Sequence, residues 1–99
     1  MPAPDPVDTR HVELPADLLA LTETLARHAH AVWQRQRLAD GWRYGPARDD
    51  QRRLHPSLVS YDELSEDERQ YDRNAALETL RAIVALGYRI LPPDSAAEP

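Results

Sequence analysis

Residues 41–61, GWRYGPARDDQRRLHPSLVSY, form a stretch that no regular helix accommodates. Two glycines and two prolines interrupt it, and it is too long for a plain turn between two helices. Leu54, Leu58 and Val59 are spaced along it as apolar anchors. We therefore expect an ordered connector that folds back onto its neighbours, and long ordered connectors in compact domains are usually functional.

The segment before this connector has the periodicity of an amphipathic helix. Apolar residues recur at three- and four-residue steps from Leu18 to Trp33. Pro15 suits the first helical position, and Gly41 suits the residue just beyond the end. The pattern predicts a first helix from Pro15 to Ala39.

The segment after the connector begins with a strong helix-start signal. In Ser65-Glu66-Asp67-Glu68 the serine hydroxyl can cap the backbone amide of Glu68, while the Glu68 carboxylate reaches back. An apolar face follows, and Gly87 is a natural left-handed end. We also expect a short strand near residues 58–61 to pair with residues 88–90.

These elements predict a mainly α fold: two antiparallel helices, a long structured connector and short β pieces. The folded unit is expected to span residues 14–91. Residues 1–13 and 92–99 carry prolines and scattered charges, and we expect both to be flexible tails.

Composition narrows the classes of function. The chain of 99 residues is the size of one domain, and it has no cysteine for a disulfide or a thiolate site. No apolar run is long enough for a membrane span or a signal peptide, so a cytoplasmic location is expected.

The net charge of -5 argues against a nucleic-acid partner. All twelve cations are arginine, which reflects either coding bias or a need for bidentate anion contacts.

The aromatic residues are unusual in kind and in place. The chain has two tryptophans, four tyrosines and no phenylalanine. Trp42, Tyr44, Tyr61 and Tyr71 all lie in or just after the connector, close in sequence to several arginines. Tryptophan and tyrosine rings have a polar edge, so they suit partly solvated sites in which a planar base stacks on the ring. Guanidinium groups suit the binding of phosphate. The alternative is that the rings only fix the loop to the helices.

Other polar residues give little support for catalysis or metal binding. His28 and His30 are two residues apart on a helix, so they cannot form the usual helical zinc pair. His55-Pro56 has no accompanying nucleophile motif. The acidic run from Glu63 to Glu68 suits a helix start without any ligand. We expect no catalytic residue, no metal site, no cofactor and no enzymatic activity.

Several motifs in order resemble the ryanodine receptor repeat domain, a module found in tandem in those calcium-release channels and as isolated copies in bacteria. They are Ala29-His30-x-x-Trp33, Gly41-Trp42-x-Tyr44-Gly45-Pro46, His55-Pro56-x-Leu58-Val59-x-Tyr61, Tyr71-Asp72-Arg73 and Leu86-Gly87-Tyr88. The resemblance covers about residues 18–90. It implies a mostly helical fold without known catalytic machinery, and the tandem pairing in the channels suggests a homodimer.

The resemblance also implies a ligand hypothesis, because ryanodine receptors respond to adenine nucleotides. We expect an adenine nucleotide or an ADP-ribose-like molecule, held by stacking and arginine contacts. In this hypothesis Trp42, Tyr44 and Tyr61 line the site, with Trp33 as a wall from the first helix. Arg48 and Arg53 meet phosphate, and His30 and Asp72 orient polar groups. The alternative is a protein interaction or assembly module without a small ligand, since Tyr, Trp and Arg are also common at protein interfaces.

Overall fold

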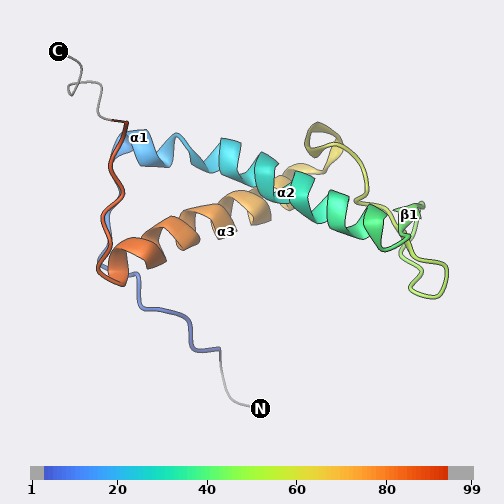
Figure 1. Cartoon of the computed structure of the whole chain (residues 1–99), viewed down its shortest axis with the longest axis horizontal. Coiled ribbons are helices and arrows are strands. Elements are labelled where there is room, and N and C mark those ends of the chain that lie inside the picture. Colours follow the sequence, from blue (N-terminus) through green and yellow to red (C-terminus); the bar gives the residue numbers. More distant parts are fainter. Residues whose placement is uncertain (1–3, 94–99) are drawn as a thin grey trace.

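Helices dominate the structure, a computed structural model that describes residues 4–93 (Figure 1). The mainly α class with short strands is confirmed, whereas the antiparallel orientation of the helices stays a prediction. Within residues 4–93, no helix is both long and apolar enough to cross a membrane. The elements in chain order are α1 (Ala16–Leu19), α2 (Thr22–Ala39), β1 (Arg43–Tyr44), β2 (Leu54–His55), the short 3-10 helix η1 (Tyr61–Glu63) and α3 (Glu66–Ala85).

The expected first helix is interrupted near its beginning, so the prediction of one continuous helix from Pro15 was wrong. A turn at residues 20 and 21 separates α1 from α2. The Thr22 hydroxyl donates a hydrogen bond of 2.9 Å to the carbonyl oxygen of Leu19. Such a side-chain bond competes with the helical ladder at the point where it breaks. The predicted end at Ala39 is confirmed, and Gly41 follows with a φ of 90°.

Both predicted ends of α3 are confirmed. The Ser65 side chain accepts a hydrogen bond from the Glu68 amide, and the Glu68 carboxylate accepts one from the Ser65 amide. At the other end Gly87 has a φ of 102°, where a side chain would be strained. The long helix is therefore started and stopped by the residues that the sequence indicated.

The predicted pairing of residues 58–61 with residues 88–90 was wrong. Among the described residues the two strands are β1 and β2, which pair in parallel and both belong to the connector. The Arg43 amide donates to the Arg53 carbonyl at 2.8 Å. The connector thus satisfies its backbone groups within itself and leaves residues 88–90 without strand structure.

Residues 61–63 form η1 because a second capping box starts it. The Ser60 hydroxyl and amide both bond the Glu63 carboxylate. The Ser-x-x-Glu spacing is the same as at Ser65 and Glu68, but only the box at Ser65 was recognised in the sequence.

The helices and the connector meet in a small core. Ala26 of α2 packs with Tyr61 and Leu64, which are both buried. A polar bridge lies at the same interface, where the Arg73 guanidinium of α3 pairs with Glu23 of α2 at 3.1 Å. α2 and α3 are therefore held together by apolar packing and by an ion pair near Tyr61 and Leu64.

The N-terminal boundary at residue 14 excludes residues that contact α3. The Thr9 hydroxyl donates to the Glu78 carboxylate at 2.6 Å, and Thr9 is buried. The Arg81 guanidinium donates to the carbonyls of Thr9 and Val12 at 2.7 and 3.2 Å. Residues 1–3 and 94–99 of the two predicted tails lie outside the described residues.

Candidate functional site

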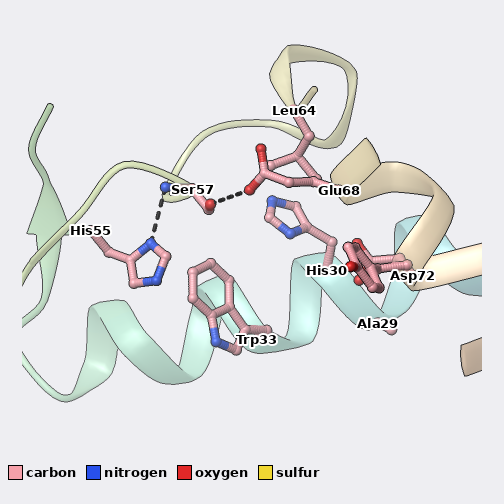
Figure 2. Close-up of a pocket in the computed structure, with 9 residues that line it drawn as sticks. Ala29, His30, Trp33, His55, Ser57, Leu64, Glu68 and Asp72 are labelled. Carbon is pink, nitrogen blue, oxygen red and sulfur yellow. Dashed lines mark hydrogen bonds between the residues drawn. The ribbon is translucent and has the colours of Figure 1, made fainter. Parts of the chain in front are cut away.

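An open cavity of about 320 Å³ lies where α2, the second half of the connector and the first turns of α3 meet (Figure 2). This volume is at the lower end of the range for small-molecule pockets. Its walls combine rings with carboxylates. The lining residues are Ala29, His30, Trp33, His55, Ser57, Leu64, Glu68, Tyr71 and Asp72.

α2 contributes the aromatic floor, because His30 and Trp33 are one helical step apart and share a face. Their rings stack with centroids 5.5 Å apart. His30 is only 6% exposed, and its Nε2 lies 2.7 Å from the Val59 carbonyl oxygen. Because a carbonyl can only accept, Nε2 carries the proton. This bond fixes the ring of His30 and ties the connector to α2.

The connector contributes His55 and Ser57 to the opposite wall. His55 meets Trp33 edge to face, with ring centroids 5.0 Å apart. Its Nδ1 accepts a hydrogen bond of 3.0 Å from the Ser57 amide. Burial first, and then the nearby cations Arg48 and Arg37, lower the pKa of His55. His55 is therefore neutral at pH 7 with its proton on Nε2.

α3 contributes two carboxylates in different states, Glu68 and Asp72, which are one helical turn apart. Glu68 accepts hydrogen bonds from the hydroxyls of Ser57 and Ser65, and the bond from Ser57 is the main cause that lowers its pKa. Asp72 has no hydrogen-bond or ion-pair partner among residues 4–93, and burial raises its pKa. The cavity thus contains one carboxylate that accepts hydrogen bonds from the protein and one half-buried carboxylate that accepts none from residues 4–93.

A second group of side chains adjoins the aromatic floor. The Arg37 guanidinium lies 5.0 Å from the Trp42 ring centroid and 5.8 Å from that of Trp33. Arg48 lies over the same Trp42 ring at 6.0 Å. Arg48 also pairs with Asp50 at 2.7 Å, whereas Arg37 forms no ion pair within residues 4–93. We call Arg37, Trp42 and Arg48 the basic edge.

The structure brings together part of the predicted site. His30, Trp33 and Asp72 line the cavity, and Trp42 and Arg48 lie on the basic edge. Three other predicted residues are elsewhere: Tyr44, Arg53 and Tyr61.

Each of those three residues has a local role in the structure. Tyr44 is 58% exposed on β1 and does not line the cavity. Arg53 donates to the Asp40 carbonyl oxygen at 2.7 Å, behind the end of α2. Tyr61 is 5% exposed, and its hydroxyl makes no hydrogen bond with any residue from 4 to 93. Burial is the main cause that raises the pKa of Tyr61. Arg53 and Tyr61 therefore hold the connector in place, whereas the Tyr44 side chain lies at the surface.

Several residues of the cavity wall and of the basic edge were not among the predicted site residues. Glu68 was interpreted only as a helix cap, His55 was set aside for want of a nucleophile, and Arg37 was not singled out. Helical spacing contained the missing signal. Arg37 follows Trp33 by four residues and Asp72 follows Glu68 by four, so each pair shares a helix face.

The polar contacts of this site suit binding better than bond cleavage. Ser57 donates its hydroxyl proton to Glu68, and a carboxylate with a lowered pKa is a weak general base. His55 receives the Ser57 amide rather than the Ser57 hydroxyl, so it does not activate that oxygen. What the cavity offers is a stacking surface, fixed dipoles and an unsatisfied acceptor.

Comparison with known protein families gives one finding. The family model described as RyR domain matches residues 3–92. The match includes all the cavity residues and the basic edge, together with residues 9–12, which contact α3.

Proposed function

The chain belongs to the RyR domain family, and from that premise we propose that it is a non-enzymatic domain that binds a nucleotide-derived small molecule. The observation that carries the proposal is the cavity. The Trp33 ring and the Asp72 carboxylate, which has no protein donor within residues 4–93, both line it, and the two guanidinium groups of the basic edge adjoin it.

The two ends of this arrangement match the two ends of a nucleotide. A purine base stacks on an indole, and such stacking is worth about 1–3 kcal/mol per base. Phosphate oxygens accept hydrogen bonds from guanidinium groups, which Arg37 and Arg48 supply on the basic edge. An adenine nucleotide or ADP-ribose has both parts, and we propose this class as the ligand. Binding, rather than turnover, is the expected activity.

Titration with a ligand panel tests this function. We expect AMP, ADP, cyclic AMP or ADP-ribose to raise the Tm of the chain and to give a saturable calorimetric isotherm in the micromolar range. Binding stabilises the folded state in proportion to the logarithm of ligand concentration, so the shift must grow with ligand. No shift and no heat for any of the four at millimolar concentration would overturn the proposal.

A second candidate is an assembly module, and exposed apolar residues favour it. Leu86, Tyr88 and Leu91 follow α3 and are all strongly exposed, and Leu19 and Leu21 are exposed near α1. Patches of this kind often mark protein contacts. A homodimer is the partner that we propose for them, and it is compatible with ligand binding at the cavity. Sedimentation velocity that shows only monomer at high micromolar concentration would contradict it.

A further inference from the structure

The polar groups that line the cavity differ in whether the protein satisfies them. His30 Nε2 bonds the Val59 carbonyl, His55 Nδ1 accepts the Ser57 amide, and Glu68 accepts two serine hydroxyls. Of the two lining carboxylates, only Asp72 accepts no hydrogen bond from a donor within residues 4–93. Desolvating a carboxylate without a donor costs free energy, so an unsatisfied one in a cavity suggests a donor that arrives with the ligand.

The position of Asp72 defines which part of a ligand it meets. Asp72 comes from α3 and Trp33 from α2, and both line the same cavity (Figure 2). Asp72 also borders a smaller apolar groove of about 240 Å³, lined by Leu25, Ala29, Ala75, Ala76, Thr79 and Leu80. A ligand that occupies the larger cavity therefore meets both the Trp33 ring and the Asp72 carboxylate.

We infer that Asp72 determines specificity by accepting a hydrogen bond from an amino group on the edge of the bound purine. An ionised carboxylate can only accept hydrogen bonds, so it selects an edge that donates. Adenine presents its exocyclic amino group as a donor. The same purine without that group would cover the half-buried Asp72 without giving it a donor, and a site that hydrogen-bonds one group of a ligand discriminates against the analogue that lacks that group. The inference rests on the proposed nucleotide function, because it assumes a purine stacked on Trp33.

The charges around Asp72 are consistent with this role. Burial and the neighbouring Glu68 raise its pKa, whereas His30 lowers it. A carboxylate in such a site gains from a donor that is brought by the ligand and kept away from water. Asn at this position would keep one acceptor oxygen and lose the charge, so it should retain part of the selectivity.

The test compares AMP with purine riboside 5′-monophosphate, which lacks only the amino group, by titration calorimetry on the whole chain. We expect AMP to bind the natural chain about tenfold more tightly, as one charge-assisted hydrogen bond allows. In Asp72→Ala this ratio should fall to about one, and in Asp72→Asn to an intermediate value. Asp67→Ala is the matched control, since it removes an exposed carboxylate of the same helix and should leave the ratio unchanged.

Each other outcome identifies what fails. Equal affinity of the natural chain for both ligands, or a tenfold ratio that persists in Asp72→Ala, would overturn the role of Asp72 while the nucleotide function stands. A ratio lost equally in Asp67→Ala would also overturn it, because the effect would then be one of general charge. If neither ligand binds at millimolar concentration, both the proposed function and this inference are wrong.

Discussion

The first half of the connector, residues 41–53, and the second half, residues 54–61 with the short stretch to Leu64 that follows, are held by different kinds of contact. The first half is bonded mainly through its own backbone. Asp49 and Leu54 exchange two backbone hydrogen bonds of 2.9 Å, and the Asp49 carboxylate accepts from the amides of Gln51 and Arg52. Its conspicuous side chains stay at the surface or on the basic edge.

The second half is held to the helices by side chains. His30 of α2 bonds the Val59 carbonyl, Ser57 bonds Glu68 of α3, and Leu58 and Leu64 are buried. These contacts build the cavity wall. The comparison teaches that the half richest in aromatic and basic residues is bonded mainly within itself, whereas the plainer half supplies the connector's part of the cavity wall.

Of all the changes considered, disturbing the junction between the two halves should have the largest effect, a loss of thermal stability. Gly45 is buried, and a Cβ added there would lie 2.7 Å from Leu54 Cβ. Gly45→Ala overpacks the β1 and β2 pair, at a cost of roughly 1–3 kcal/mol. For a domain of this size the fall in Tm is about 10 °C, measured by thermal circular dichroism. Ala47→Val, at an exposed position nearby, is the control and should leave Tm unchanged; equal shifts in the two variants would contradict the packing argument.

Removing one ring from the cavity and one from the first half should separate binding from loop structure. Trp33→Leu keeps an apolar side chain but loses the stacking face, and we expect AMP affinity to fall at least about tenfold. Tyr44→Leu removes an exposed ring outside the cavity and should change the affinity by less than about twofold. Calorimetry measures both. A larger loss for Tyr44→Leu would move the site to the first half of the connector.

The second half should also be the more sensitive to acid. The Ser57 hydrogen bond, the main cause, lowers the pKa of Glu68 below its ordinary value of 4.5. An acid with a lowered folded-state pKa contributes stability above the ordinary value and loses it as pH falls through the folded-state value. We therefore expect the Tm of the natural chain to decrease below pH 4.5 more steeply than that of Glu68→Gln. Parallel Tm curves for the two chains would contradict this contribution.

The smallest effect, a modest loss of AMP affinity, is expected from a change at the basic edge. Arg48 already pairs with Asp50 and is exposed, so its gain from a ligand phosphate is modest. Arg48→Gln should weaken AMP binding by about threefold and leave adenosine binding unchanged. Arg53→Gln is the matched control, because Arg53 bonds the Asp40 carbonyl instead. A loss of adenosine affinity in Arg48→Gln would mean that Arg48 supports the fold rather than phosphate.

Local signals in the sequence were sufficient for both ends of α3 and for the end of α2, but not for the break between α1 and α2. The capping box at Ser65 and the glycines at 41 and 87 act through nearest neighbours, so their effect can be read without knowing the fold. The strand partners could not be predicted in this way. Residues 43 and 44 pair with residues eleven positions later, and that choice depends on how the loop around Asp49 closes.

The candidate site was only partly predictable for a related reason. Aromatic richness pointed to Trp33 and Trp42, which are adjacent to the cavity or in its wall. It also pointed to Tyr61, whose hydroxyl looks suited to a ligand but is buried in the core. The face of α3 that meets α2 depends on tertiary packing, so Glu68 could be recognised as a cap and not as a lining residue.

The two tryptophans provide the most direct test of the central claim that the base binds on Trp33 and the phosphate on the basic edge. Each gives one indole N–H signal in a ¹H–¹⁵N correlation spectrum, and the variants Trp33→Phe and Trp42→Phe assign them. Added adenosine should shift the Trp33 signal and leave the Trp42 signal in place, whereas AMP should shift both. An immobile Trp33 signal at millimolar AMP, or a shift confined to Trp42 with adenosine, would contradict the account.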